Sequence, residues 1–266
     1  MLRIGFAPRL RLYAAKYKED MQLFRQIMKE TQKYASVFLC NFERFECHTD
    51  ILGKDLDGIC SMAHNPTTLS LLSCFETLGI QVVNPVSSVK KCLDTASTLM
   101  FLQRRGVPVP LSSLHRRSFK DLEFPVILKN IASFRAKARR TIILYSSKDL
   151  AIYMDFFKNG LWVAQRLLEK FALMKVYIVG KDVISIKQLQ RTVAKNDQKY
   201  RTMSFSEISE ASLLCGSLMN LEIYNIEWVI DREGMWVIDI NDFPSFSGIP
   251  KAPKIIAHYL KKRFQK

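Results

Sequence analysis

The sequence predicts a mixed fold in which a small α/β lobe precedes an α+β body. Over residues 1–90, short apolar strands alternate with helical segments, which is typical of a parallel sheet. From Phe124 onward, several strand segments follow one another, and the last two form a hairpin, which indicates antiparallel pairing. The segment Val107–Pro110 stands between these parts, and its prolines exclude a helix and turn the chain into a new lobe.

The helices and strands of the first part are predicted from apolar runs and from the glycines that end them. Strands are expected at Leu2–Phe6, Ser36–Asn41, Leu56–Met62 and Ile80–Val83. Helices are expected at Asp20–Tyr34, Asn65–Leu78 and Ser87–Arg104. Gly79 and Gly106 end the last two of these helices, since glycine readily adopts the left-handed conformation of a helix end.

The second part contains more strands than helices. Strands are expected at Phe124–Lys129, Thr141–Tyr145, Trp162–Arg166, Lys175–Val179 and Val183–Gln188, with a hairpin formed by Glu227–Ile230 and Met235–Ile240. Helices are expected at Ser147–Lys158, Ser206–Leu221 and Lys254–Arg263, with Ser206 as the cap of the second.

Composition indicates a globular protein of a reducing compartment. Of the 266 residues, 48% are hydrophobic, which is ample for a core. No apolar run reaches the roughly 18 residues that a membrane span needs, and the N-terminus lacks the apolar stretch of a signal peptide. The six cysteines form no CxxC pair, which favours free thiols. We therefore expect a cytoplasmic monomer without a membrane span.

The formal net charge of +15 favours a polyanionic partner. Nucleic acid, a phosphoinositide membrane and a polyphosphorylated small molecule all fit this charge, and charge alone does not choose among them. Nucleic acid is therefore not excluded.

The segment Trp236–Pro250 carries the strongest chemical signal. Asp239 and Asn241 are separated by one residue in a predicted strand, so period-two alternation places both on one face. Glu227 lies across the short hairpin and adds a third oxygen donor. Mg²⁺ prefers such oxygen ligands, so these residues are candidates to hold it against ATP phosphates. A solvent-facing strand end with an Asx turn before Pro244 is the alternative.

Five segments in the same order resemble ATP-grasp enzymes, and most closely the inositol 1,3,4-trisphosphate 5/6-kinase family. They are NPVSSVKKCLD at 84–94, FPVILK at 124–129, WVAQRLLEK at 162–170, LMKVYIVGKDVISIK at 173–187 and WVIDINDFPSFSGIP at 236–250. This resemblance implies an ATP-grasp fold with three lobes. They are an α/β lobe at 1–90, a central lobe at 91–168 and a C-terminal lobe with the metal site at 169–266.

The resemblance also implies roles for individual residues, with ATP and Mg²⁺ as the cofactors. Lys129 and Lys175 would bind the ATP phosphates, and Gln165 with Leu167 would line the adenine pocket. Lys187 would lie near the transferred phosphate. Glu227, Asp239 and Asn241 would hold magnesium.

The sequence departs from the family mainly on the substrate side. The loop at 130–144 has no glycine, whereas the family covers the phosphates with a glycine-bearing loop. It carries instead four cations, Arg135, Lys137, Arg139 and Arg140, and Arg140 stands where the family has a substrate-binding histidine. Thr95, Gln188 and Ser245 replace two arginines and a glycine of the family.

The function expected from this resemblance is an ATP- and Mg²⁺-dependent kinase. Its acceptor would be a small polyanion, an inositol polyphosphate, bound with the help of Arg140 and the basic surface. An ATP-grasp carboxylate–amine ligase of the glutamate type is the first alternative, because it uses the same ATP and magnesium site. A catalytically weakened ATP-grasp binding protein is the second.

Overall fold

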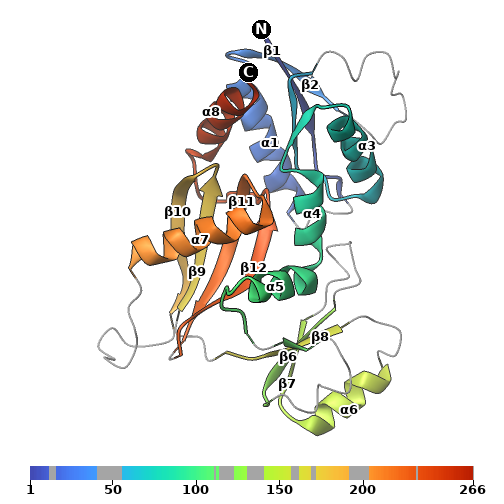
Figure 1. Cartoon of the computed structure of the whole chain (residues 1–266), viewed down its shortest axis with the longest axis vertical. Coiled ribbons are helices and arrows are strands. Elements are labelled where there is room, and N and C mark those ends of the chain that lie inside the picture. The colour runs from blue at the N-terminus through green and yellow to red at the C-terminus, as the bar shows by residue number, and fades with distance from the viewer. Residues whose placement is uncertain are drawn as a thin grey trace.

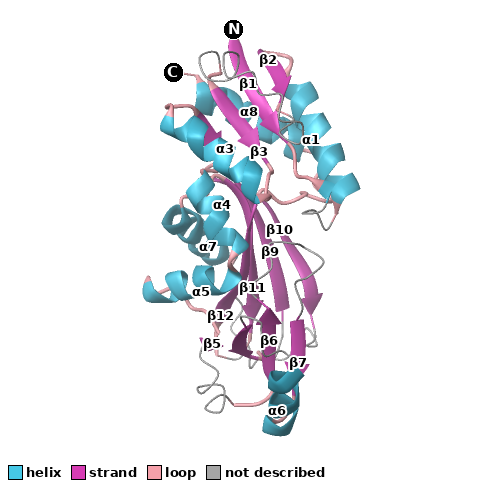
Figure 2. Cartoon of the chain, turned by 90° about the vertical axis from the view of Figure 1, so that its right-hand side faces the viewer, coloured by secondary structure: helices cyan, strands magenta, loops and turns pink. Residues whose placement is uncertain are grey.

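The computed structural model contains three four-stranded sheets that follow one another along the chain (Figure 1). The described residues are 1–11, 16–40, 56–110, 112–113, 123–130, 141–156, 162–168, 172–191, 204–231 and 233–265. Figure 2 shows an elongated molecule in which the C-terminal sheet, from β9 (Ala172–Val179) to β12 (Met235–Asp242), lies between the other two. Each sheet is the centre of one lobe.

The N-terminal sheet is parallel, with the strand order β2-β1-β3-β4. Its strands are β1 (Leu2–Ala7), β2 (Ala35–Leu39), β3 (Gly58–Ser61) and β4 (Gln81–Val83). Helix α1 (Tyr17–Thr31) follows β1, and α3 (Pro66–Thr77) connects β3 to β4. The last four residues of β1 are buried, as expected for a parallel strand that is covered on both faces.

Helix α8 (Ala252–Phe264), near the C-terminus, completes the N-terminal lobe. It packs against α1, and both helices lie beside the N-terminal sheet in Figure 1. Phe24 and Ile27 of α1 share a hydrophobic core with Leu260 and Phe264 of α8. This core also includes residues of the C-terminal sheet, so it joins the two lobes.

The central lobe is antiparallel, with the order β5-β8-β6-β7. Its elements are β5 (Ser112–Ser113), β6 (Val126–Asn130), β7 (Thr141–Leu144), α6 (Ser147–Phe156) and β8 (Trp162–Arg166). Val126 and Leu128 point to one face and pack with Leu150 of α6. Period two then places Ile127 and Lys129 on the other face.

The C-terminal sheet is antiparallel, with the order β10-β9-β11-β12. Its strands are β9 (Ala172–Val179), β10 (Asp182–Arg191), β11 (Ile223–Ile230) and β12 (Met235–Asp242). Helix α7 (Phe205–Met219) lies over one face, where Val176, Ile226 and Trp228 pack against Cys215 and Met219. Figure 2 shows α4 (Val86–Leu93), α5 (Thr95–Arg104) and α7 on that same side of the sheet. The opposite face is therefore the one that can receive a ligand.

Gly216 allows α7 to approach this sheet closely. A Cβ at Gly216 would lie 1.9 Å from the hydroxyl oxygen of Tyr224, a buried residue of β11. We expect Gly216→Ala to lower the free energy of unfolding by about 1–3 kcal/mol, because the ring must move within a packed core. Urea unfolding measures this effect. Ser217→Ala, at the exposed neighbouring position, is the control, and an equal loss in both variants would contradict the packing argument.

Several helix boundaries differ from the sequence prediction, and two of the differences have a clear cause in capping. The predicted helix Ser87–Arg104 is two helices, α4 (Val86–Leu93) and α5 (Thr95–Arg104), separated at Asp94. The side chain of Asp94 accepts a hydrogen bond from the Ser97 N–H at 3.1 Å and so begins a new helix. Helix α7 begins one residue earlier than predicted, because Ser204, not Ser206, forms a capping box with Glu207.

The predicted fold class is confirmed in its mixture of one parallel and two antiparallel sheets. The lobe boundaries 1–90, 91–168 and 169–266 stay a proposal. Helices α4 and α5 both contact β12, so the middle of the chain packs on the C-terminal sheet. Among the described residues, no helix has the length and apolar character that crossing a membrane requires.

Candidate functional site

A row of four charged side chains crosses the open face of the C-terminal sheet. Lys187 of β10 is paired with Lys175 of β9, Lys175 with Glu227 of β11, and Glu227 with Asp239 of β12. Their sequence neighbours Val176, Ile186 and Trp228 pack on the α7 side, so all four side chains point to the other face. The sheet thus places the two candidate phosphate-binding lysines beside the two carboxylates that the sequence analysis grouped as metal ligands.

Lys175 and Glu227 form an ion pair at the centre of this row. The distance from Lys175 Nζ to Glu227 Oε1 is 2.7 Å, and each side chain is 21% exposed. Burial by itself lowers the pKa of Lys175, but the charge and hydrogen bond of Glu227 outweigh it and raise that pKa above its ordinary value. A candidate phosphate ligand and a candidate metal ligand therefore neutralise each other in this structure.

Asp239 and Asn241 lie on the same face, as their spacing predicts. Asn241 Nδ2 donates to Asp239 Oδ2 at 2.8 Å. One step along the sheet, Asn241 is paired with Asn225, and Asn225 with Tyr177 of β9. Asn225 and Tyr177 were not selected from the sequence, although Asn225 precedes Glu227 by the same interval that links Asp239 to Asn241.

Lys187 contacts the loop that follows β12. Its Nζ donates to the backbone oxygen of Ser247 and lies 5.4 Å from the centre of the Tyr177 ring. A Cβ at Gly248 would lie 3.0 Å from this Nζ, and Gly248 has a φ of +70°, so glycine suits the position on both grounds. The loop thereby holds the ammonium group at the edge of the open face.

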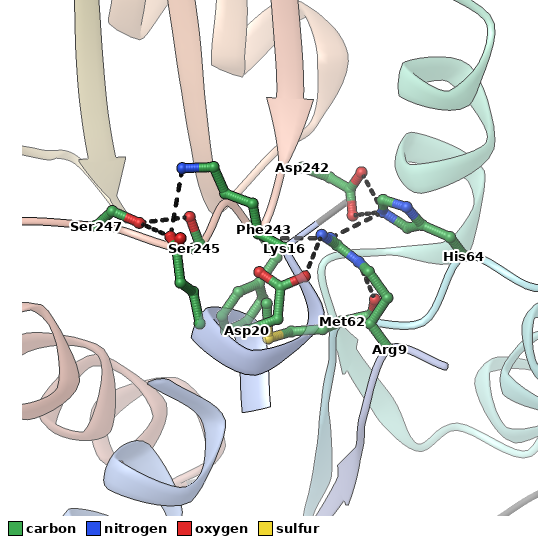
Figure 3. A network of polar contacts seen from close by, with 10 residues as sticks. Arg9, Lys16, Asp20, Met62, His64, Asp242, Phe243, Ser245 and Ser247 are labelled. Atoms are coloured by element: carbon green, nitrogen blue, oxygen red, sulfur yellow. Dashed lines mark hydrogen bonds and ion pairs between the residues drawn. The ribbon is translucent and has the colours of Figure 1, made fainter. Parts of the chain in front are cut away.

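A buried polar network links the N-terminal lobe to the end of β12 (Figure 3). Arg9 donates to Asp20 Oδ2 at 3.2 Å, to the Met62 oxygen at 3.0 Å and to the Phe243 oxygen at 3.2 Å. His64 Nε2 lies 2.9 Å from Asp242 Oδ1. Because Asp242 and Phe243 directly follow Asn241, this network positions the strand end that carries the candidate metal ligands.

The pKa values of the two carboxylates in this network are shifted in opposite directions. Burial raises the pKa of Asp20 above its ordinary value, although the charge of Arg9 opposes it. Burial also acts to raise the pKa of Asp242, but the charge and hydrogen bond of His64 outweigh it, so that this pKa lies below its ordinary value. Both side chains are only 3% exposed, so both depend on their hydrogen-bonding partners.

Removing Arg9 should destabilise the protein. Arg9→Met leaves Asp20 buried without its ion-pair partner, which should lower the free energy of unfolding by about 3–5 kcal/mol. Urea unfolding measures the loss. Arg25→Met, at an exposed position of α1, should change it by no more than about 0.5 kcal/mol. If both variants behave alike, the network contributes little to stability.

The central lobe places two of the predicted nucleotide contacts on one face. Lys129 of β6 and Gln165 of β8 both lie opposite the face that packs against α6. Gln165 is buried and its Nε2 donates to Ser112 Oγ at 3.1 Å. The N–H of Leu167, the next residue on that side of the chain, donates to the Pro125 oxygen at 3.1 Å.

Part of the predicted site lies outside the described residues. Arg140 and its neighbours Arg135, Lys137 and Arg139 fall in 131–140, so the predicted contact of this basic loop with an acceptor or with ATP stays a prediction. Among the described residues, no group of three or more histidine, cysteine, aspartate or glutamate side chains is close enough together to hold a metal ion. The candidate magnesium site has only two carboxylates, Glu227 and Asp239, and an amide, Asn241.

Comparison with solved structures decides the fold. A D-alanine–D-alanine ligase from Bacillus anthracis superposes with a TM-score of 0.72 over 98% of this chain and 95% of its own, at 14% identity. The ATP-grasp ligase PsnB, solved with a minimal precursor, superposes with a TM-score of 0.74 over 99% and 100%, at 16% identity. The chain has the ATP-grasp fold. This confirms the fold that the sequence motifs indicated.

Sequence comparison finds relatives that are named glutamate ligases. A "Probable alpha-L-glutamate ligase" of Legionella pneumophila (strain Corby) is 22% identical over 221 residues, which cover 73% of this chain and 71% of the relative. A "Coenzyme gamma-F420-2:alpha-L-glutamate ligase" of Methanococcus maripaludis is 23% identical over 204 residues, which cover 67% and 68%. No protein-family model matches the chain.

The predicted inositol polyphosphate kinase function is wrong. The similar proteins are named glutamate ligases, and the D-alanine–D-alanine ligase shares the fold over nearly the whole chain. The error arose because ATP-grasp kinases and ligases use the same ATP-binding elements. Thr95, Gln188 and Ser245, where the sequence departs from the kinases on the substrate side, were the signal against that function.

Proposed function

We propose that the protein is an ATP-dependent ligase that joins a carboxylate to an amine. The observation that carries the ligase assignment is the alignment of two thirds or more of the chain with proteins named glutamate ligases. The row Lys187–Lys175–Glu227–Asp239 supports a nucleotide site on the open face of the C-terminal sheet. A ligase needs such a site because it activates its carboxylate with ATP.

The proposed roles follow from charge and position. Lys175 and Lys129, on two different sheets, bind the phosphates of ATP. Gln165 and Leu167 line the adenine pocket. Lys187, at the edge of the open face, stabilises the charge that develops on the transferred phosphate.

Glu227, Asp239 and Asn241 fit Mg²⁺ in their chemistry, since they present oxygen donors side by side on one face. When bound there, Mg²⁺ would neutralise phosphate charge and orient the γ-phosphate. The ATP-grasp ligase PsnB has been solved with Mg and ADP, which supports this pairing of ion and nucleotide. The residues of this chain contribute by holding the donors on a strand that the Arg9 network fixes.

The reaction has two steps. In the first, an oxygen of the carboxylate attacks the γ-phosphorus of ATP, the bond from that phosphorus to ADP breaks, and an acyl phosphate forms. In the second, the amine nitrogen attacks the acyl carbon, the bond to phosphate breaks, and the amide forms with release of a proton and inorganic phosphate. The cationic side chains Lys129, Lys175 and Lys187 stabilise the negative charge in both steps.

A cavity of about 380 Å³ beside Lys187 supports an amino acid as the amine. It is lined by the N-terminal part of α1 and by the loop after β12, and it carries Lys16 and Glu19 with Ser245 and Ser247. Ser247 donates to Glu19 and lowers the pKa of that carboxyl below its ordinary value, so Glu19 stays ionised. Lys16 Nζ lies 3.3 Å from Glu19 Oε2, and an amino acid bound in the cavity would replace this ion pair with contacts to its own two charges.

A turnover assay tests the proposed function. Purified protein is incubated with ATP, Mg²⁺, a panel of carboxylates and amino acids that includes glutamate, and the products are analysed by mass spectrometry. We expect ADP, phosphate and an amide in equal amounts. A stable phosphorylated product without an amide, or nucleotide binding without any turnover, would contradict the ligase assignment.

A further inference from the structure

Asn225 is a buried polar residue that lacks partners at the centre of the candidate site. It lies on β11 between Tyr177 of β9 and Asn241 of β12. Its side chain is 0% exposed, and neither its Oδ1 nor its Nδ2 has a hydrogen-bond partner in the described part of the chain. A buried amide without a hydrogen-bond partner destabilises the folded protein, because the amide has lost its hydrogen bonds to water without gaining others.

The side chain of Asn225 points to the open face. Its neighbours Tyr224 and Ile226 belong to the core under α7, whereas Ile223 belongs to the core shared with the N-terminal lobe. Asn225 therefore shares a face with Glu227, Asn241 and Asp239. Its burial argues against direct contact with a substrate, so the partner must come from an adjacent side chain.

Asn241 is the adjacent side chain that can supply this partner. Directly opposed residues of an antiparallel pair have Cβ atoms about 4.5–5.5 Å apart, which amide side chains can bridge. In this structure, Asn241 Nδ2 donates to Asp239 Oδ2 instead. If Asp239 Oδ2 and the Asn241 oxygen bind a metal ion, the amide of Asn241 turns toward that ion and its nitrogen becomes free to donate to another acceptor.

We propose that Asn225 is a positioning residue for the metal site, and that its oxygen accepts the hydrogen bond from Asn241 Nδ2 when metal and nucleotide are bound. The empty protein then carries the unpartnered amide, and the loaded protein satisfies it. Asn225 thereby favours the loaded arrangement of Asn241 without touching the metal. This inference rests on the metal–nucleotide part of the proposed function and is independent of which carboxylate and amine are joined.

The test uses Asn225→Leu, which keeps the size of the side chain and removes its polar atoms. Without ligands, this variant should have a Tm roughly 2–4 °C higher than the wild type, because the unpartnered amide is gone. Its affinity for a non-hydrolysable ATP analogue with Mg²⁺, measured by calorimetry, should be about tenfold lower. In the background of Asn241→Ala, Asn225→Leu should cause no further loss of affinity.

Opposite changes in Tm and affinity distinguish positioning from a purely structural role. A lower Tm with unchanged affinity, or a higher Tm with unchanged affinity, would overturn the inference. If the variant does not fold, the side-chain amide signals of Asn225 and Asn241 in the wild-type NMR spectrum decide. Both should shift when Mg²⁺ and the analogue are added together, and a fixed Asn225 signal beside a shifted Asn241 signal would overturn the inference.

Failure of the proposed function has a different signature. A wild-type protein that does not bind the analogue in the presence of Mg²⁺ would overturn the nucleotide site and this inference with it. Wild-type binding that Asn225→Leu leaves intact would overturn this inference alone.

Discussion

Asp239→Asn should remove most of the magnesium-dependent turnover while leaving the fold intact. Asp239 is paired with Glu227 on the open face. Its charge is the more available of the two for a metal ion, because Glu227 already forms an ion pair with Lys175. Replacing it by an amide of the same shape keeps the packing and removes the negative charge that a metal ion requires. We expect a loss in kcat of roughly 10²–10³-fold, the size typical for one preorganised charge contact at a transition state.

The assay is ATP turnover at saturating nucleotide and increasing Mg²⁺, with circular dichroism to verify folding. Asp182→Asn provides the matched control, because Asp182 is an exposed carboxylate at the start of β10. It should leave turnover unchanged. Full activity of Asp239→Asn would show that Asp239 is not a metal ligand and would contradict the proposed position of the magnesium site.

Lys175→Met should have two effects of opposite sign. Loss of a charge-assisted contact to phosphate should weaken nucleotide binding by about ten- to a hundredfold. The same substitution frees Glu227 from the 2.7 Å ion pair, so that its carboxylate becomes available to a cation. Binding of Mg²⁺ in the absence of nucleotide should therefore become tighter, and calorimetry with Mg²⁺ alone measures it.

Both effects follow because Lys175 is a candidate phosphate ligand and also the ion-pair partner of a candidate metal ligand, Glu227. Under the proposed roles, ATP would attract Lys175 away from Glu227, and the released carboxylate would then bind the metal ion, so the two ligands would favour each other. Lys181→Met, at an exposed turn, should change neither affinity. Weaker nucleotide binding combined with unchanged Mg²⁺ binding would show that the ion pair does not couple the two ligands.

Local patterns predicted much of the fold because most strands and helices are marked by their own residues. The period-two spacing of Asp239 and Asn241 correctly placed both side chains on one face. The break at Asp94 was missed because the flanking helices look continuous in hydrophobic pattern, and only the side chain of Asp94 caps the second one. The cap of α7 was displaced by two residues because Ser204 and Ser206 are both good caps, and Glu207 selects between them.

The contacts of the site depend on pairing that local patterns do not contain. Lys175 and Glu227 are 52 residues apart, and His64 and Asp242 are 178 apart, so only the assembled sheets bring them together. Asn225 could have been found by extending the period-two rule back from Glu227. The acceptor class could not be predicted in this way, because it depends on side chains that differ between enzymes with one fold.

The packing of α8 on α1 has a consequence for synthesis on the ribosome. Leu260 and Phe264 complete the core around Phe24 and Ile27, although more than two hundred residues separate the two helices in the chain. The first lobe to be translated is therefore the last to close its core, and its apolar α1 surface stays uncovered until α8 has emerged. During that interval the nascent N-terminal lobe is exposed to chaperones and to aggregation, whereas the central sheet can already pair its own strands.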